Sequence, residues 1–418
     1  MSDKRKVKVG VLGAGRGESM IRYCLTADNA EVVAICDKYE PALEGYKDKN
    51  IALYTDFDEF LKNDEIEAVV LANYANEHAP FAVKCLEAGK HVFSEVLPFQ
   101  NLKEGVELVE AVEKSGLVYS YGENYCYMGP TQEMRRLLRD GSVGTFEYAE
   151  AEYMHNCEYH WERITRADPD HWRNNMTATF YCTHSIGPLI HITGKRPVQV
   201  VGFEAPFNSR MKRMGAKAGP MAMEIITFED GTFAKSIHGV GCPKFSYWFN
   251  IQGSKGNMET AREITGELTF DTLYTEIDAF EGEHLEGSEK RIRKYKPTGF
   301  NPEMDAKFGH AGGDFYTMYY FCERILGDEN AETIDIYEAC DMFLPGLFAY
   351  KSILAGNMPM QIPNFRDPAE REKWRHDTSC TDPAAAGDML LPSYSKGTPE
   401  IPNEVYDRLR DMLENPQD

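Results

Sequence analysis

The chain of 418 residues exceeds the usual size of one domain, so two domains are expected, each with its own core. Hydrophobic residues make up 42% and charged residues 27%, a balance that excludes a disordered or fibrous protein. With 45 basic and 67 acidic residues the net charge is −22, which repels phosphate backbones and anionic lipids, so neither nucleic acid nor a membrane is an expected partner.

The first elements alternate between strands and helices. Valine-rich apolar runs predict parallel strands buried on both faces at residues 7–12, 32–36, 68–71, 91–94 and 117–121. Amphipathic stretches at 79–88 and 102–114 predict helices between them. This alternation predicts an α/β fold that starts with a doubly wound parallel sheet, a Rossmann domain over residues 1–125.

After residue 125 the pattern changes. A helix is predicted at 131–139, followed by alternating segments typical of antiparallel strands at 145–153, 224–228, 233–238, 247–252 and 266–272. These segments predict an α+β domain over residues 126–365, with a large, mostly antiparallel open sheet closed by helices at 314–326 and 335–354.

Three further stretches are less regular. Residues 207–220 and 281–300 are expected to be surface excursions. The proline-rich and charged residues 366–418 are expected to form a C-terminal extension that ends in a helix near 405–414.

The chain shows no sign of export. Its charged first residues lead into a strand interrupted by glycines rather than a signal sequence, and no apolar run approaches the roughly 18 residues of a spanning helix. The ten cysteines are scattered without a C-x-x-C pair, a usage typical of reduced thiols. We therefore expect a cytoplasmic protein.

A glycine-rich turn follows the first strand. Gly13, Gly15 and Gly17 precede a helix that starts near residue 18, where a side chain would block both the tight turn and the approach of a diphosphate to helix N–H groups. The spacing departs from G-x-G-x-x-G because the third glycine comes one residue early. Alone, this motif is a weak signal, and a plain strand-to-helix turn is the alternative.

Asp37 strengthens the dinucleotide interpretation. It lies 22 residues beyond Gly15 at the end of the second predicted strand, where a carboxylate would bind the ribose hydroxyls of NAD and disfavour the 2′-phosphate of NADP. An ordinary loop acid is the alternative, and the neighbouring Lys38 could partly admit NADP. The predicted cofactor is NAD.

Residues 76–98 read NEHAPFAVKCLEAGKHVFSEVLP, and this segment resembles the Gfo/Idh/MocA oxidoreductase family, whose members carry N-x-x-H-x-P and A-G-K-H-V-x-x-E-K-P. The resemblance covers about residues 7–365 and implies a Rossmann domain followed by a domain whose open sheet often forms oligomer contacts. Together with the turn and Asp37 it places the expected cofactor contacts at Gly13, Gly15, Arg16, Gly17, Asp37, Asn73, Asn76, His78, Glu95 and Asn124.

One departure matters. The family's E-K-P reads Glu95-Val96-Leu97-Pro98, so the lysine that commonly assists hydride and proton transfer is missing. Segments 123–127 (ENYCY), 181–188 (YCTHSIGP) and 310–314 (HAGGD) are similar to a branch of NAD-dependent glycosidases of the α-N-acetylgalactosaminidase type. That resemblance implies transient oxidation of a sugar at C3, elimination of the C1 substituent, addition of water and reduction of the ketone. No carboxylate pair of the usual glycosidase kind is then required.

The resemblance also suggests proton carriers. His184 aligns with a family histidine near the nicotinamide, although the aspartate four residues earlier is replaced by Phe180, so Tyr181 could share its work. His155 follows a predicted strand where the branch also has a histidine. Buried or solvated structural histidines are the alternatives.

Substrate contacts are expected at four residues: Tyr127, Trp172, Arg173 and His310. Trp172 could stack on a sugar and Arg173 hold an oxygen, although packing is an equal alternative. His310 lies in a glycine-flanked turn that lets a ligand approach the backbone. Several histidines fall between 155 and 191, but no H-E-x-x-H or similar spacing appears, so no metal is expected.

The sequence therefore predicts an NAD-dependent oxidoreductase that acts on a sugar or glycoside, with glycosidic cleavage as the favoured outcome. A sugar or polyol dehydrogenase with net oxidation is one alternative, and a non-catalytic cofactor-binding sensor is another. A carbohydrate is the expected partner, and a homo-oligomer is expected through the open sheet.

Overall fold

The computed structural model describes residues 5–262, 271–278 and 291–415. Their contacts divide the chain into two compact units. Unit 1 comprises residues 1–129, 298–340 and 365–376, and unit 2 comprises residues 130–297, 341–364 and 377–418. Within the described ranges, no helix combines the length and apolar character needed to cross a bilayer.

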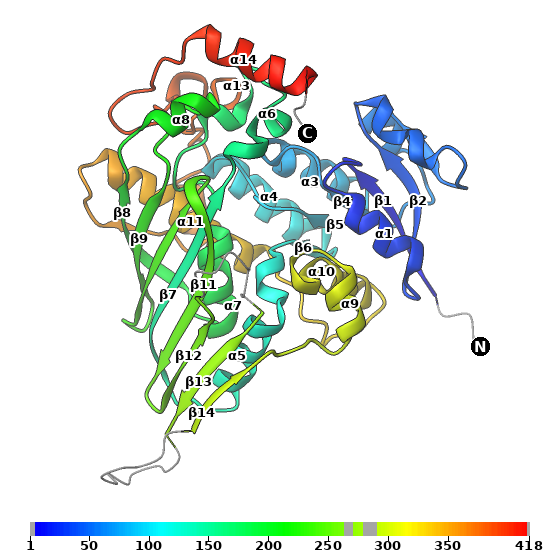
Figure 1. Cartoon of the computed structure of the whole chain (residues 1–418). Helices are drawn as coiled ribbons and strands as arrows, with labels where there is room; N and C mark the ends of the chain where they lie inside the picture. The colour runs from blue at the N-terminus through cyan, green and yellow to red at the C-terminus, as the bar shows by residue number, and fades with distance from the viewer. Residues whose placement is uncertain (1–4, 263–270, 279–290, 416–418) are drawn as a thin grey trace. The chain divides into compact units, whose positions relative to one another are not determined.

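Unit 1 contains a six-stranded parallel sheet in the order β3-β2-β1-β4-β5-β6 (Figure 1). The predicted strands are confirmed to within two residues, and the sheet adds a short strand, β3. The strands are β1 Val7–Leu12, β2 Ala30–Cys36, β3 Ala52–Tyr54, β4 Ala68–Leu71, β5 His91–Ser94 and β6 Tyr119–Tyr121. Every residue of β4 is buried, as expected for a parallel strand covered on both faces.

The helices of unit 1 begin and end at recognisable signals. In α4, for example, the Asn101 side chain accepts a hydrogen bond from the Glu104 N–H, and Gly116 ends the helix with φ +63°. The helices that lie wholly within unit 1 are α1 Glu18–Thr26, α2 Phe57–Leu61, α3 His78–Glu87, α4 Leu102–Ser115, α9 Pro302–Lys307, α10 Gly313–Ile325 and α12 Pro368–Glu372.

The helix at residues 314–326 was predicted to close the second domain, but its contacts group it with unit 1. Helix α10 belongs to unit 1, where it packs against α1. The Tyr23 and Phe315 rings lie 5.4 Å apart, and Tyr23 donates a hydrogen bond to Asn29, which in turn donates to Glu323. Aromatic packing against α1 therefore holds this helix, which comes late in the sequence, within the Rossmann unit. Helix α11, Ile336–Leu354, starts in unit 1 and continues into unit 2.

Unit 2 is built on a nine-stranded sheet in the order β14-β13-β12-β11-β7-β10-β9-β8-β15 (Figure 1). All pairs are antiparallel except β7 with β10. The strands are β7 Phe146–Asn156, β8 Pro197–Glu204, β9 Ala222–Phe228, β10 Phe233–Gly239, β11 Gly241–Gly253, β12 Gly256–Thr260, β13 Leu273–Ile277, β14 Arg291–Tyr295 and β15 Met360–Gln361. The predicted mostly antiparallel sheet is confirmed.

Helix α7, Thr183–Thr193, covers one face of this sheet against β7, β10 and β11. Because strand side chains alternate between faces, Tyr153, Ser236 and Glu224 lie on the covered face, whereas Ile225, Ile237 and Phe233 lie on the other. The other helices are α5 Gly129–Arg139, α6 Trp161–Thr165, α8 Ser209–Met214, α13 Pro383–Ala386 and α14 Asn403–Glu414. The predicted C-terminal helix is confirmed by α14.

The expectation that residues 207–220 form a surface excursion was wrong. They contain α8, whose Met211 and Met214 are buried, and the Tyr406 hydroxyl of α14 donates to the Gly215 carbonyl at 2.8 Å. The prediction missed the buried side of α8 because basic residues alternate with the apolar ones in this stretch.

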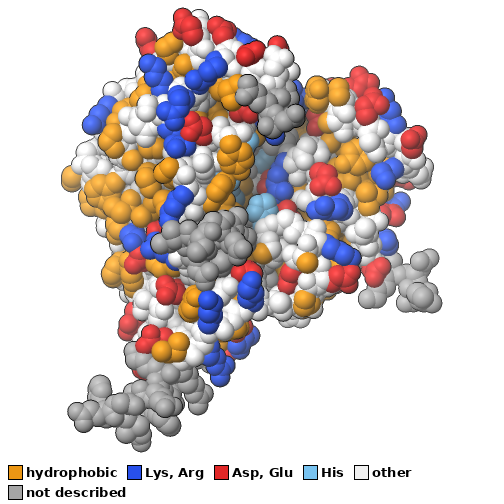
Figure 2. Space-filling model, viewed as in Figure 1, with side chains coloured by type: hydrophobic (Ala, Val, Ile, Leu, Met, Phe, Trp, Pro, Cys, Tyr) orange, Lys and Arg blue, Asp and Glu red, His pale blue; other side chains and the backbone are white. Residues whose placement is uncertain are grey.

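Most of the residues in the segments predicted at 266–272 and 281–300 lie outside the described residues. On the face shown in Figure 2, acidic and basic side chains are interspersed rather than gathered by sign.

Candidate functional site

The candidate residues form two groups, one in each unit. The glycine-turn group of unit 1 lies where β1 and β4 end. Gly13 has φ +93°, and a Cβ there would lie 2.5 Å from the Ala72 carbonyl oxygen; a Cβ on Gly17 would lie 2.4 Å from the Gly13 oxygen. A Cβ on Gly15 would meet no atom within 4 Å. Glycine is therefore required by the fold at 13 and 17, whereas position 15 leaves open space beside the turn.

Asp37 lies directly after β2 and is bonded to this turn. Its carboxylate accepts hydrogen bonds from the backbone N–H groups of Ala14 and Tyr39, both at 2.8 Å. The strand order reverses between β1 and its neighbours β2 and β4, which is the switch point at which doubly wound sheets bind nucleotides. The neighbouring Lys38 lies 3.8 Å from Glu77 and over the Tyr74 ring.

Asn73 follows β4 at the same edge. Its amide nitrogen donates to Glu77 at 3.1 Å, while its buried Oδ1 atom has no hydrogen-bond partner in the part of the chain that the structure describes. A buried acceptor without a donor is costly, and a bound ligand would satisfy it. The open space at Gly15, the Asp37 carboxylate and this acceptor fit a dinucleotide.

Arg16 joins two buried carboxylates. Its guanidinium lies 2.7 Å from Glu95 and 3.1 Å from Asp314, whose side chains are 7% and 3% exposed. Asn124 donates to Asp314 at 2.8 Å, and His310 Nδ1 lies 3.1 Å from the same oxygen. Burial raises the pKa of Glu95. Burial alone would also raise the pKa of Asp314, but hydrogen bonds and charge from His310 and Arg16 outweigh it and hold that pKa far below its usual range.

We expect Arg16→Met to lower the free energy of unfolding by about 3 kcal/mol at pH 7, because it leaves two buried carboxylates without their main counter-charge. The loss should shrink at pH 4, because protonation then removes part of the uncompensated negative charge. Urea denaturation of the cofactor-free protein at both pH values measures this. Arg22→Met, which breaks an exposed pair with Glu18 at 4.0 Å and a contact with the Phe308 ring, is the control and should cost less than about 1 kcal/mol. Equal losses at both pH values would contradict the role of charge.

The other predicted residues of unit 1 have structural contacts. His78 Nδ1 lies 2.8 Å from the Leu97 carbonyl, and Asn76 precedes α3. The Tyr127 hydroxyl donates to the Glu332 carbonyl at 2.6 Å and the residue is 2% exposed, a placement that favours packing over sugar binding. The His310 side chain is 37% exposed in a left-handed turn with φ +54°, so it remains accessible to a ligand.

The α7 group of unit 2 surrounds the start of that helix. His184 lies in its first turn and is buried; its ring stacks on Tyr181 at 5.7 Å and lies 4.5 Å from the Tyr153 ring. The Arg173 guanidinium donates to the Tyr181 hydroxyl oxygen. Because arginine can only donate, the Tyr181 proton is directed to another acceptor. This arrangement can hold and pass a proton beside an imidazole.

Trp172 is placed differently from the sugar-stacking expectation. It is only 9% exposed and packs against His171 and Phe180, with the Arg173 guanidinium 4.6 Å above its ring. These contacts favour the packing alternative for Trp172. Arg173 itself is held between Trp172 and Tyr181 and binds the Tyr181 oxygen, so its predicted contact with a substrate oxygen stays a prediction.

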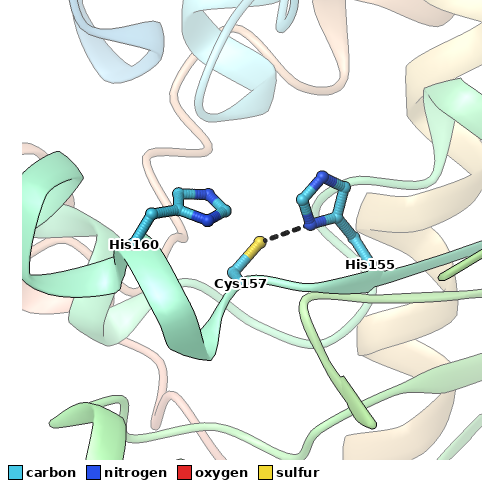
Figure 3. Close-up of side chains that lie close together, drawn as sticks. All are labelled: His155, Cys157 and His160. Carbon is cyan, nitrogen blue, oxygen red and sulfur yellow. Dashed lines mark hydrogen bonds between the residues drawn. The ribbon is translucent and has the colours of Figure 1, made fainter. Parts of the chain in front are cut away.

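His155, at the end of β7, lies beside two residues that the sequence interpretation did not select. Cys157 Sγ lies 2.9 Å from His155 Nδ1, and the His155 and His160 rings are 5.6 Å apart (Figure 3). Burial raises the pKa of the Cys157 thiol to about 12 and lowers that of His160. The segment H-x-C-x-x-H was the available signal, which the spacing of histidines alone does not reveal.

A buried polar chain lies beneath α7. Ser185 Oγ is 2.7 Å from Ser236 Oγ, which is 3.2 Å from His238 Nδ1, and His238 Nε2 is 3.3 Å from Glu224. All four side chains are fully buried. None was predicted, because their pairing depends on the register of β9 with β10 and on the helix that covers it. These polar contacts connect helix α7, which carries His184, to the sheet.

Comparisons with known proteins agree with this geometry. Residues 7–123 match the model of the oxidoreductase family with an NAD-binding Rossmann fold, Gfo/Idh/MocA, and residues 128–375 match the model of the glycosyl hydrolase 109 C-terminal domain. A glycosyl hydrolase family 109 protein of Solibacter usitatus is 24% identical over 88% of this chain and 89% of its own length. An alpha-N-acetylgalactosaminidase of Shewanella oneidensis is 24% identical over 88% and 86%.

Solved structures share the fold. A levoglucosan dehydrogenase in complex with NADH and levoglucosan matches with a TM-score of 0.70 at 17% identity, over 86% of this chain and all of the other. A scyllo-inositol dehydrogenase from Lactobacillus casei matches with a TM-score of 0.66 at 17% identity, over 86% and 99%. The chain thus joins an NAD-binding Rossmann domain to the C-terminal domain of the hydrolases, and it belongs to the glycosyl hydrolase 109 family.

Proposed function

We propose that this protein is an NAD-dependent glycosidase that cleaves a pyranoside by transient oxidation of the sugar. The observation that carries the proposal is the set of groups around His184, which are Tyr181, Tyr153 and Arg173 rather than the two carboxylates of ordinary glycosidases. A phenol and an imidazole can carry protons to and from sugar hydroxyls and carbon, but they suit a redox-assisted elimination better than direct acid cleavage.

Bound NAD supplies a two-electron acceptor for hydride from a sugar carbon and returns the hydride at the end of the cycle. In unit 1, Gly15 leaves room for the diphosphate, Asp37 would hold the ribose hydroxyls and Asn73 offers its unsatisfied Oδ1 atom as an acceptor. In unit 2, Tyr181 would first pass its own proton to another acceptor and would then, as a phenolate, take the proton of the sugar hydroxyl as its carbon is oxidised. Arg173 holds the Tyr181 oxygen throughout, and His184 exchanges protons beside it.

Incubation with p-nitrophenyl N-acetyl-α-D-galactosaminide and other aryl glycosides in D₂O tests this proposal. Release of nitrophenol with deuterium at C2 of the sugar is expected, without net NADH. Stoichiometric accumulation of NADH with an intact glycoside would instead support the sugar dehydrogenase alternative. The absence of both reactions across the sugar panel would support a non-catalytic sensor.

We also propose a homo-oligomer formed through the uncovered face of the unit 2 sheet. Apolar cross-strand neighbours lie on that face, for example Phe203 beside Met223 and Met223 beside Ile237, and Phe203 and Phe233 are 41% and 48% exposed. Further along the same face the rows continue onto Lys235, Glu150 and Glu152. Apolar patches of this kind favour association.

All ten cysteines lie among the described residues and none forms a disulfide, which supports a reducing, cytoplasmic location.

We expect Ile225→Lys to lower the molar mass measured by light scattering after size exclusion, because a buried ammonium would be unpaired in such an interface. Leu25→Lys, at a position 47% exposed in unit 1, is the control and should leave the mass unchanged. An unchanged mass for Ile225→Lys would place the contact elsewhere.

A further inference from the structure

A second group of chemically active side chains lies on the short segment from the end of β7 to α6. His155, Cys157 and His160 each offer one ligand atom, and the three atoms lie within 4.8 Å of one another. Figure 3 shows the three side chains converging, with Cys157 Sγ 2.9 Å from His155 Nδ1. Phe245 and Tyr159 flank the two imidazoles, with ring distances of 4.7 Å to His155 and 4.4 Å to His160.

The backbone sets this convergence. The His160 N–H donates to the Cys157 carbonyl at 3.2 Å, which forms a 3₁₀ turn over residues 158–160. A 3₁₀ turn has three residues per turn, so residues 157 and 160 point to the same side. The Cys157 N–H donates to the Val240 carbonyl at 3.0 Å, which anchors the turn beside β10. The ligand atoms therefore meet because of main-chain hydrogen bonds and not only because of flexible side chains.

The donors suit one class of ion. Two imidazole nitrogens and a thiolate are ligands for zinc and its neighbours, whereas magnesium and calcium require oxygen. Bond lengths of about 2.1 Å to nitrogen and 2.3 Å to sulfur place tetrahedral ligand atoms about 3.5 Å apart, so a shift of about 1 Å would close the site. His160 Nδ1 is buried without a hydrogen-bond partner among the described residues, and Cys157 is only 6% exposed. A buried acceptor of this kind points to a ligand.

We propose that His155, Cys157 and His160 bind one divalent ion of the zinc class. Three protein ligands leave a fourth coordination position for water or another ligand. The site lies within unit 2, and its occupancy does not depend on the proposed glycosidase activity.

Cobalt binding tests the site directly. The tag-free full chain with its NAD is stripped with a chelator and titrated with Co²⁺. We expect one equivalent to produce a sulfur-to-cobalt charge-transfer band in the near ultraviolet and tetrahedral bands in the visible spectrum, and Zn²⁺ to abolish both by displacement. Mg²⁺ and Ca²⁺ should not compete. A wild-type protein that binds no Co²⁺ or Zn²⁺ would overturn the proposal.

Variants identify the ligands. Cys157→Ser should remove the charge-transfer band, and Cys157→Ser and His160→Gln should each weaken Zn²⁺ binding by about 100-fold or more in competition with a chromophoric chelator. Cys380→Ser and the exposed His376→Gln are matched controls in the C-terminal region and should bind as the wild type does. Circular dichroism checks that each variant is folded, and if Cys157→Ser does not fold, His160→Gln decides. Unchanged affinity in a folded ligand variant would refute the site, whatever the result with aryl glycosides.

Discussion

Replacing Tyr181 with phenylalanine is expected to lower kcat by about 10²–10⁴-fold while leaving the Kd for NADH unchanged. The change removes one oxygen, which in the structure accepts a hydrogen bond from Arg173 beside the stacked His184 ring. The glycine-turn group, which is proposed to bind NAD, lies in unit 1 and does not include Tyr181. Steady-state release of nitrophenol and titration of NADH fluorescence measure the two quantities.

Tyr148→Phe is the matched control for Tyr181→Phe. Tyr148 lies in the same unit, on β7, but on the sheet face that α7 does not cover, where its ring packs against Phe233 at 4.9 Å. The same loss of a phenolic oxygen there should change kcat by less than about threefold. A Tyr181→Phe enzyme that retains wild-type kcat would assign the proton transfer to His184 or another group.

The Rossmann sheet could be predicted from the sequence because its strands are buried on both faces and therefore appear as unbroken apolar runs. Val7–Leu12 and Ala68–Leu71 are examples. Strand β3, Ala52–Tyr54, was missed because it is short and half-buried throughout. The place of α10 could not be predicted, because its partners in α1, such as Tyr23 beside Phe315, lie almost 300 residues earlier in the sequence. Local sequence patterns predict that a helix or strand forms, but not the hydrophobic core against which it packs.

The candidate site shows the same limit. The glycine turn and Asp37 were predictable because their spacing lies within one strand-turn-helix unit, and their hydrogen bond is consistent with that prediction. The pairing of Arg16 with Asp314 and that of Ser185 with His238 depend on tertiary contacts across long separations. Cys157 and His160 are different, because their proximity to His155 follows from a local turn that the sequence encodes.

Gly15→Val is expected to weaken NADH binding by about 100-fold, or about 2.7 kcal/mol, with little change in stability. Two observations separate these effects. A Cβ at position 15 would touch nothing within 4 Å, so the folded chain has room for a side chain. That same open space is where the diphosphate is proposed to lie, so the valine methyl groups would displace it from the helix N-terminus.

Two further glycine variants make this result interpretable. Gly45→Val, also in unit 1 and also without any atom within 4 Å of its Cβ, should change neither stability nor NADH affinity. Gly13→Ala should instead destabilise the protein by about 2–4 kcal/mol, because φ is +93° and the new Cβ would lie 2.5 Å from the Ala72 oxygen. If Gly15→Val bound NADH normally, the diphosphate could not lie against this turn. If Gly15→Val lost as much stability as is expected for Gly13→Ala, the turn would be tighter at position 15 than its surroundings indicate. The affinity for NADH would then be measured on Gly15→Ala.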